Sequence, residues 1–337
     1  ALASIPIIFR LDPMAAFAGP LSESRNLSDY YAHFGVDEET IRKVMAAALS
    51  KGGDYCDVYF EHSIHSSVGI EDSLVNRASS DVDFGVGIRV LKGDQTGYSF
   101  TEVITPEAMK LAAKTAANIA SGAGTAPPQQ LTFHSTPEYY AIESPWQDVG
   151  IDQKIPRLKK IDENMRKADS RVVRSQVYFH DYTTWMLVAN SSGRIACDYQ
   201  PMTRVYAMAT AEKEGRKEQH YESFGGRIGL EYYTDENLDY LANSAVKGAI
   251  ELFDATPMEG GEMEVVLAPG DSGIILHEAI GHGMEADYNR KGKSIFADKI
   301  GKPVAENFVS IVDDGTMPNH RGSINVDDEG NDTNRTF

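Results

Sequence analysis

Two stretches of this chain consist of short runs of aromatic and β-branched residues separated by turn signals. Such side chains pack well on a pleated sheet, so each run is predicted to be a β-strand. The runs are 55–61, 67–71, 84–91, 96–103, 172–179, 185–189, 195–199 and 205–211. The turn sequence KGDQ at 92–95 joins two of them as a hairpin. Because parallel strands need long crossover connections, these short connections predict antiparallel pairing.

Helical periodicity fills the segments between and after these runs. Apolar residues recur on one face of each segment, which is the pattern of a helix packed on a core. The predicted helices are 37–50, 106–120, 152–168 and 235–253, with Asp37 and Asp235 expected as caps and Pro106 in the first turn. Strands and helices therefore occur in comparable amounts, with no regular strand–helix alternation.

These elements predict an α+β fold. Residues 29–256 are expected to form an N-terminal mixed domain of antiparallel strands and helices, and 255–261 looks like a joint. Residues 257–337 are expected to form a partial, strand-rich C-terminal domain. This domain is predicted to begin with a strand at 262–268, and to continue into a helix that starts near Gly273.

The first 28 residues form a separate case. The tract 1–18 is apolar apart from a few polar residues and prolines, and 16–18 (AFA) resembles a cleavage site for export. Residues 1–28 are therefore either the remnant of an export signal or an arm packed on the body. The first alternative implies an exported protein.

Charge and composition exclude several classes of function. The 337 residues carry 32 Lys and Arg against 50 Asp and Glu, a formal net charge of −18, with no basic stripe. Direct nucleic-acid binding and polybasic membrane binding are thus not expected, since both need concentrated positive charge. No run reaches 18 apolar residues, so no membrane span is expected. The two cysteines, Cys56 and Cys197, are too few for a disulfide framework.

The segment with the clearest chemistry is 276–292, LHEAIGHGMEADYNRKG. His277 and His282 bracket Glu278, and this combination on a helix suggests a zinc peptidase. The histidines are five residues apart rather than four, so a regular α-helix would rotate them about 140° apart. Sharing one metal ion thus requires a π-bulge or a helix break at Gly281. Gly281 and Gly283 flank His282 and can take backbone conformations that other residues avoid, which makes either change possible.

Glu278 follows a candidate ligand directly in the sequence. A general base that takes a proton from an attacking water would be expected at that position. An ordinary solvated helix carboxylate is the alternative role.

The motif and its surroundings resemble the TldD branch of the TldD/PmbA (TldE) family, also known as the modulator of DNA gyrase family. The resemblance covers residues 29–337. It rests on HEAIGH with the flanking GHGMEADYNRKG, and on YCDVYFE (55–61), GIED (69–72), GVGIRV (85–90), TGYSF (96–100), VDDGT (312–316) and RGSINVDDEG (321–330).

The resemblance implies a cytoplasmic metallopeptidase that holds Zn²⁺ through His277 and His282, with Glu278 as the general base. In the family a cysteine located beyond the position of Phe337 supplies the third protein ligand, so the metal site within these residues is expected to be incomplete. Neither Cys56 nor Cys197 lies in matching sequence.

Three functions remain open at this point. The first is hydrolysis of unfolded or extended peptides by a heterodimer with a PmbA/TldE-like subunit, or by a homodimer. The second is a non-catalytic binding or scaffold subunit of such a complex. The third is direct modulation of gyrase, which the net charge of −18 disfavours as far as DNA contact is concerned.

Two acidic clusters, at 313–314 and 327–329, also need interpretation. Their Asp and Gly content favours capped turns. Alternatively, Asp313 or Asp314 orients a ligating histidine through its second ring nitrogen.

Overall fold

The structure is a computed structural model that describes residues 31–32, 34–124, 127–270 and 272–337. It forms two compact units. The first runs to Asp254 and includes Asp314–Arg335, whereas the second comprises Ala255–Asp313 and Thr336–Phe337. The domains 29–256 and 257–337 stay a prediction, and the expected arm at 1–28 lies outside the described residues.

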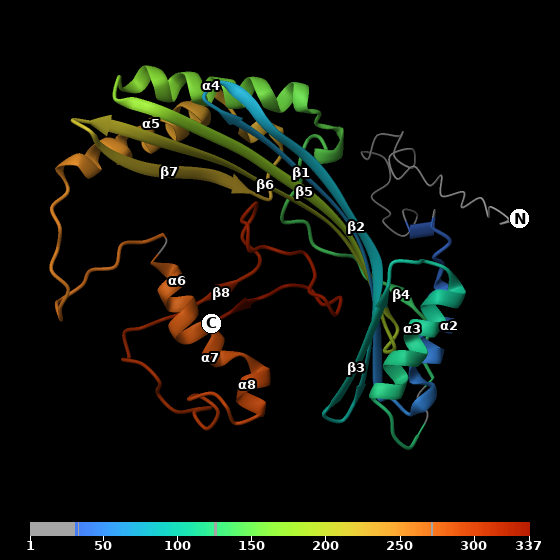
Figure 1. The fold of residues 1–337 in the computed structure, drawn as a ribbon. Coiled ribbons are helices and arrows are strands. Elements are labelled where there is room, and N and C mark those ends of the chain that lie inside the picture. The colour runs from blue at the N-terminus through green and yellow to red at the C-terminus, as the bar shows by residue number, and fades with distance from the viewer. Residues whose placement is uncertain (1–30, 33, 125–126, 271) are drawn as a thin grey trace, which may run out of the picture. The chain divides into compact units, whose positions relative to one another are not determined.

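The first unit is built on a seven-stranded sheet of order β3-β2-β1-β5-β6-β4, with β7 also paired to β6 (Figure 1). Its strands are β1 (Tyr55–Glu71), β2 (Leu74–Lys92), β3 (Gln95–Thr101), β4 (Thr132–Phe133), β5 (Val172–Asn190), β6 (Arg194–Lys213) and β7 (Arg216–Gly226). All pairs are antiparallel except β4 with β6. The α+β class predicted from the sequence is confirmed.

The strands are longer than the sequence pattern indicates. The runs 55–61 and 67–71 are parts of the single strand β1, because the polar residues between them pair with β2 on one side and β5 on the other. The runs 172–179 and 185–189 merge into β5 in the same way. β7 was not predicted, since its sequence contains no β-branched residue and its pairing with β6 determines its conformation.

The predicted strand at 262–268 is wrong. This segment contains no regular structure, and Val265 and Val266 are 69% and 96% exposed. β-branched residues favour a strand only where a neighbouring strand supplies hydrogen bonds and packing, and no strand pairs with this segment among the described residues.

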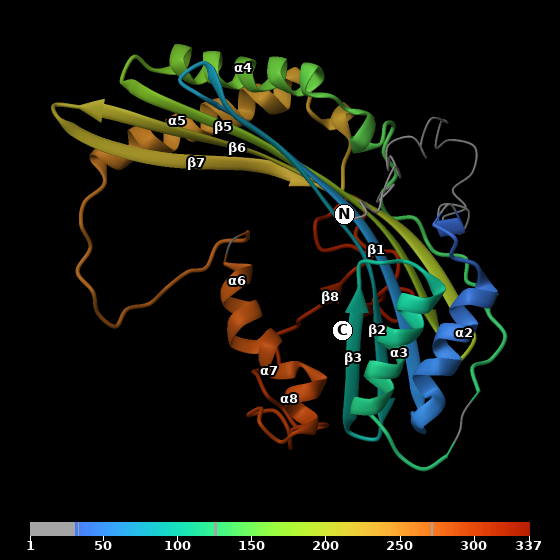
Figure 2. The ribbon, with the colours of Figure 1, turned by 45° about the vertical axis from the view of Figure 1, so that its right-hand side comes forward.

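Four long helices cover one face of the sheet, as Figure 1 and Figure 2 show. They are α2 (Glu38–Ala48), α3 (Pro106–Ile119), α4 (Ile151–Ala168) and α5 (Asp235–Glu251). Asp37 caps α2 as predicted, accepting a hydrogen bond of 2.7 Å from the Thr40 amide. The expected cap of α5 is wrong by one residue: Thr234 has the extended backbone of a cap and accepts from the Asn237 amide, whereas Asp235 lies in the first turn.

The remaining elements are short. They are the 3₁₀ helices η2 (Leu49–Lys51), η3 (Trp146–Asp148), η4 (Leu230–Tyr232) and η5 (Leu252–Asp254), the helices α6 (Gly273–Leu276), η6 (His277–Gly281), α7 (His282–Met284) and α8 (Ala286–Arg290), and the paired strands β8 (Asp313–Asp314) and β9 (Arg335–Thr336). No described helix is long and apolar enough to cross a membrane.

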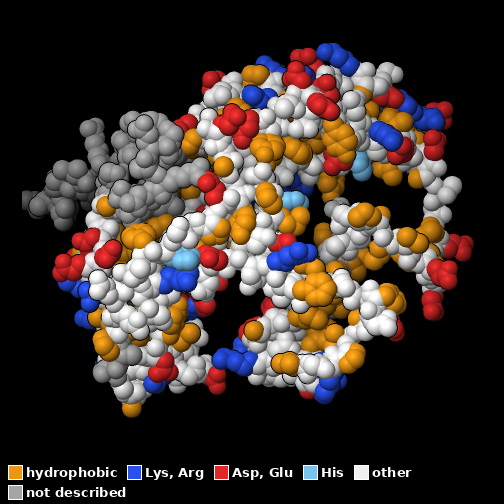
Figure 3. All heavy atoms as spheres, turned by 180° about the vertical axis from the view of Figure 1, so that it is seen from behind, with side chains coloured by type: hydrophobic (Ala, Val, Ile, Leu, Met, Phe, Trp, Pro, Cys, Tyr) orange, Lys and Arg blue, Asp and Glu red, His pale blue; other side chains and the backbone are white. Residues whose placement is uncertain are grey.

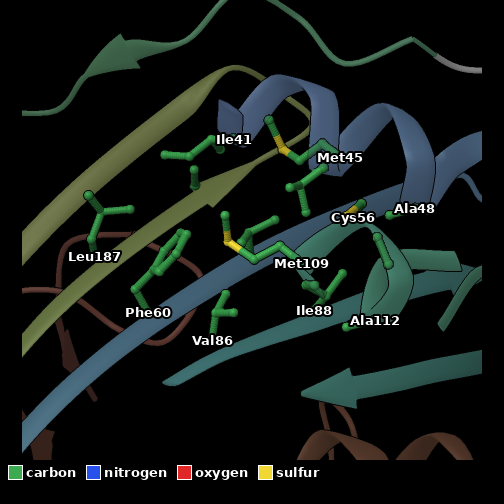
Figure 4. Packing of buried hydrophobic residues seen from close by; sticks show 14 of the residues in the cluster. Ile41, Met45, Ala48, Cys56, Phe60, Val86, Ile88, Met109, Ala112 and Leu187 are labelled. Atoms are coloured by element: carbon green, nitrogen blue, oxygen red, sulfur yellow. The ribbon is translucent and has the colours of Figure 1, made fainter. Parts of the chain in front are cut away.

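Two hydrophobic cores lie between the helices and the sheet. One packs α2 and α3 against one end of the sheet, and Figure 4 shows Met45 and Met109 meeting Phe60 and Ile88 there. The other packs α4 and α5 against the opposite end of β5 and β6. Alternate strand residues supply both cores, so the helices bury one face of the sheet except along residues 74–83 of β2, which are exposed.

The opposite face carries the segment 314–335 at one end. Val326 packs with Met186, Val188 and Ala196 from β5 and β6. The buried carboxylate of Asp198 accepts hydrogen bonds from Tyr140, Gln200 and, at 2.8 Å, the Asn325 side chain. These polar contacts attach 314–335 firmly to the sheet, because each donor compensates the cost of burying that charge.

Two substitutions in α3 test the first core. Met109 is fully buried and Leu111 is 68% exposed on the same helix. We expect Met109→Ala to lower the free energy of unfolding by about 2 to 5 kcal/mol, and Leu111→Ala to change it by less than about 0.5 kcal/mol. Urea unfolding followed by circular dichroism measures both. Equal effects of the two substitutions would contradict this packing.

Candidate metal centre

The segment of the HEAIGH motif is helical throughout but not regular. α6 leads into one π-helical turn, η6, which spans His277–Gly281, and α7 follows directly from His282 (Figure 1). A π-turn bonds residues five apart, so side chains with that spacing lie above one another. The expected loss of regular α-helical bonding near Gly281 is confirmed.

The π-turn brings the three polar side chains of the motif together. The His277 and His282 ring centroids lie 4.5 Å apart at an interplanar angle of 74°. One ligand atom from each of His277, Glu278 and His282 lies within 4.8 Å of the others. All three residues are exposed. Two imidazoles and a carboxylate at this separation can converge on one ion.

The two glycines of the motif have different roles. Of the two predicted alternatives the structure has the π-turn, and Gly281 has φ −56° and ψ −55°, an ordinary helical conformation. The π-turn spreads the change in geometry over five helical residues instead of one strained residue. Gly283 is required for space, because a Cβ there would lie 2.7 Å from the Phe296 ring.

The residues after the motif fold back onto it. Ser294 donates a hydrogen bond to the Gly283 carbonyl, and the Asn289 side chain donates to the same oxygen at 3.0 Å. Asn289 also donates to the Glu285 carbonyl at 2.8 Å. These contacts satisfy carbonyls that a helix end leaves without partners, and they hold the end of the helix in place.

Glu285 is a site residue that the sequence reasoning missed. Its carboxylate lies 2.6 Å from His282 Nδ1, which leaves Nε2 on the side of Glu278, 3.7 Å from that carboxylate. The hydrogen bond to Glu285 raises the pKa of His282, and the charges of Glu285 and Glu278 add to it. A carboxylate behind a histidine fixes the ring orientation of many metal ligands. In the sequence, the signal for Glu285 is its spacing of three residues from His282, which is the spacing of neighbours on a helix surface.

The other acidic clusters form turns. Asp314 accepts hydrogen bonds from the amide and hydroxyl of Thr316, and Asp327 accepts from the amides of Glu329 and Asn331. Neither has a histidine among its hydrogen-bond partners. The capped-turn interpretation of both clusters therefore describes the contacts that the structure shows.

The cysteines make poor ligands where they lie. Cys56 is buried, and Cys197 is half-buried against the same core. Burial raises the pKa of both thiols, to about 12 for Cys197, which disfavours the thiolate form that binds metals.

The unit that carries the motif has little interior of its own. No described residue of 255–270 or 272–313 is buried. Ile274 and Ile275 in α6 are 60% and 56% exposed, and Figure 3 shows hydrophobic side chains on the surface of this unit. The candidate metal site is therefore open, without the dry wall that encloses most catalytic sites.

The contact between Glu285 and His282 is testable by titration. Replacing Glu285 by Gln removes the carboxylate that favours the protonated ring, so the midpoint of His282 should fall toward the ordinary histidine value. Because the pair favours protonation in the folded chain, its stabilising effect exists at low pH and is lost as the pH rises through the raised pKa. Proton NMR of metal-free protein measures the midpoint in wild type, in Glu285→Gln and in the control Glu306→Gln. An unchanged midpoint in Glu285→Gln would remove Glu285 from the site.

Family models match three parts of the chain. Residues 56–120 match PmbA/TldA metallopeptidase domain 1, residues 144–253 match the central domain, and residues 260–337 match the C-terminal domain.

Curated relatives agree with this assignment. The chain is 31% identical to the metalloprotease TldD homolog of Haemophilus influenzae over 299 residues, which cover 87% of this chain and 62% of that protein. It is 32% identical to the homolog from Buchnera aphidicola subsp. Schizaphis graminum over 284 residues, 82% of this chain and 59% of the relative. The chain thus spans about three fifths of the length of these relatives.

Solved structures share the fold. A modulator of DNA gyrase from Thermotoga maritima superposes with a TM-score of 0.70 at 22% identity, over 89% of this chain and 68% of that one. TldE from Thermococcus kodakarensis gives a TM-score of 0.67 at 17% identity, over 88% and 66% of the two chains. The three domain matches, which follow one another along the sequence, and the curated relatives show that the chain belongs to the TldD/PmbA metallopeptidase family.

Proposed function

We propose that this chain is the metal-carrying part of a zinc-dependent peptidase. His277 and His282 are the proposed ligands and Glu278 the proposed general base. The observation that carries this proposal is the π-turn, because it brings two imidazoles and one carboxylate within 4.8 Å although five residues separate the histidines. Relatives named as metalloproteases support the same chemistry.

The donor set fits zinc. Zinc in proteins is held by imidazole, thiolate and carboxylate groups, and catalytic sites have three protein ligands and an open position. The chain offers two imidazoles, and the hydrogen bond that Nδ1 of His282 donates to the Glu285 carboxylate leaves Nε2 available. The third ligand, a cysteine in the family, is expected from residues beyond 337. Bound zinc would supply Lewis-acid polarisation and a lowered pKa of water.

Glu278 is suited to move a proton. Its carboxylate is exposed and lies 3.7 Å from His282, so it borders the space between the imidazoles without filling it. A carboxylate there can accept a proton from an attacking water, and then pass it to the amine that leaves. The Glu285 carboxylate already accepts the hydrogen bond from Nδ1 of His282, so the two carboxylates have separate tasks.

The proposed substrates are unfolded or extended peptides. Residues 74–85 of β2 pair only with β1, because the pairing of β2 with β3 begins at Val86. These residues therefore present a free sheet edge among the described strands. An extended peptide can add to such an edge through main-chain hydrogen bonds that are tolerant of sequence. The proposed assembly is a heterodimer with a PmbA/TldE-like subunit, or a homodimer.

Replacing Glu278 by Gln separates the two roles in the motif. Glutamine keeps the shape of the side chain but does not accept the proton, so cleavage of an unstructured peptide should fall by about 10²- to 10⁴-fold. Zinc content should stay at the wild-type level in this variant. His277→Ala and His282→Ala should lose both zinc and cleavage. Metal analysis and peptide cleavage by the full-length protein, with its candidate partner subunit present, measure these outcomes.

Glu306→Gln is the matched control, because Glu306 is exposed in the same unit and outside the motif. It should retain both zinc and turnover. Near-native turnover in zinc-loaded Glu278→Gln would show that another group is the base. If wild-type full-length protein binds no zinc with any candidate partner, the peptidase proposal fails and the scaffold function takes its place.

A further inference from the structure

The sheet face opposite the helices has an uncovered half. The segment 314–335 packs over one end of this face through Val326 and Asn325. At the other end lie the residues that alternate with the buried core positions: Arg77 and Gly69 from β2 and β1, Tyr178 and His180 from β5, Arg204 and Tyr206 from β6, and Tyr221 from β7. We call these seven residues the Arg–Tyr face. Within the described part of the first unit no helix covers it.

The register places six of these residues in two adjacent rows across the strands, and Tyr221 in the next row, opposite Met208. Tyr178 lies opposite Tyr206, and His180 lies opposite Arg204. Gly69 pairs with both Arg77 and Tyr178, so Arg77 belongs to the same row as Tyr178 and Tyr206. Neighbours across and along strands on one face are within reach of long side chains.

The two arginines have no acidic partner. No ion pair or hydrogen bond joins Arg77 or Arg204 to a carboxylate anywhere in the described residues. Arg204 donates to the Ser223 hydroxyl at 2.9 Å, and its Nε is buried without a partner. In a chain with 50 acidic and 32 basic residues, two uncompensated arginines on one face of a sheet are unexpected. By contrast, Arg174 further along the same sheet is paired with Glu71.

Both arginine charges act on the same imidazole. Burial lowers the pKa of His180, and the charges of Arg77 and then Arg204 lower it further. His180 lies directly opposite Arg204 in the register, and an anion bound beside it would face the positive charge of both arginines.

The aromatic residues of this face are already arranged for stacking. The Tyr206 and Tyr221 rings stack with centroids 5.0 Å apart at 23°, and Tyr221 is 51% exposed. The Arg204 guanidinium lies 5.9 Å from the Tyr206 centroid, which holds it in place. Tyr178 lies over Gly69, where a Cβ would approach its ring to 2.7 Å. Rigid aromatic surfaces beside fixed arginines bind ligands at a low cost in conformational entropy.

We propose that the Arg–Tyr face binds an acidic segment of an extended peptide, with its carboxylates on Arg77 and Arg204 and an aromatic side chain stacked on Tyr221. The biological role of the Arg–Tyr face rests on the proposed peptidase function, since binding there would select acidic peptides as substrates. The binding itself requires neither the metal nor cleavage.

A peptide fits this face better than a nucleic acid does. Two arginines can pair with two carboxylates, whereas a nucleic acid carries a continuous row of phosphates that needs a longer basic track. The net charge of −18 repels such a polyanion.

Binding of a short probe peptide tests the proposal. The probe is Gly-Ser-Glu-Trp-Glu-Ser-Gly, amidated and labelled with an uncharged dansyl group, and its comparison peptide carries Gln in place of both Glu residues. Fluorescence anisotropy is measured on full-length protein with a chelator present, so that no turnover occurs. We expect the acidic probe to bind at least about tenfold more tightly than the Gln peptide, and more weakly as salt increases.

Arg77→Gln and Arg204→Gln should each weaken binding of the acidic probe about tenfold, and leave the Gln peptide unaffected. Arg77→Lys should restore part of the loss, because it keeps the charge. Arg42→Gln on α2, exposed on the helix-covered side, is the matched control and should bind like wild type. Thermal unfolding of each variant verifies that the fold is intact. If Arg204→Gln unfolds, Arg77→Gln keeps the test decisive, because the Arg77 side chain has no hydrogen bond or ion pair to lose among the described residues.

Equal affinity for the two peptides, or wild-type binding by both arginine variants, would overturn the proposal. Tighter binding of a short oligothymidylate than of the acidic probe would overturn it in favour of a nucleic-acid surface. Loss of zinc or of cleavage in the motif variants does not affect this binding, so failure of the peptidase function and failure of the Arg–Tyr face are distinguishable.

Discussion

The hydrogen-bond ladder between β1 and β5 runs from Asp57↔Asn190 to Glu71↔Gln176 without a break in register. It passes through a polar middle section, with Ser63 bonded to Thr184 by a 2.7 Å hydrogen bond between their hydroxyls. Because the ladder continues through this section, the two cores at its ends belong to one sheet. The four long helices of the first unit then lie on one face, and the other face carries the segment 314–335 at one end and polar and aromatic side chains at the other. The docking of 314–335 and the Arg–Tyr face both depend on this asymmetry.

The candidate metal centre depends on a different structural feature, the π-turn. A regular helix would separate His277 and His282, and a sharp break would leave backbone groups without partners. The π-turn avoids both, since every residue from Leu276 to His282 keeps a helical conformation. One extra residue in the turn is enough to bring the two rings to 4.5 Å. The local cost of the π-turn is compensated by hydrogen bonds from the residues that follow, including Asn289.

Much of this arrangement can be predicted from the sequence, where local signals determine structure. The Asp37 cap, the helix after Pro106 and the need for an irregular helix at Gly281 follow from residue type and spacing alone. Pairing between strands is harder to predict from the sequence. β7 is a strand because β6 lies beside it, while 262–268 has strand-forming residues and no neighbouring strand. Glu285 was missed for a different reason: carboxylates are common on helix surfaces, and a spacing of three residues from a histidine does not by itself distinguish this one.

The central claim is that His277 and His282 share one zinc ion. Zinc K-edge X-ray absorption of the full-length, zinc-loaded protein measures this directly, because imidazole ligands produce a recognisable scattering pattern from their outer ring atoms. Two imidazoles are expected in the zinc shell of the wild-type protein. A wild-type zinc shell with one imidazole or none would contradict the shared site.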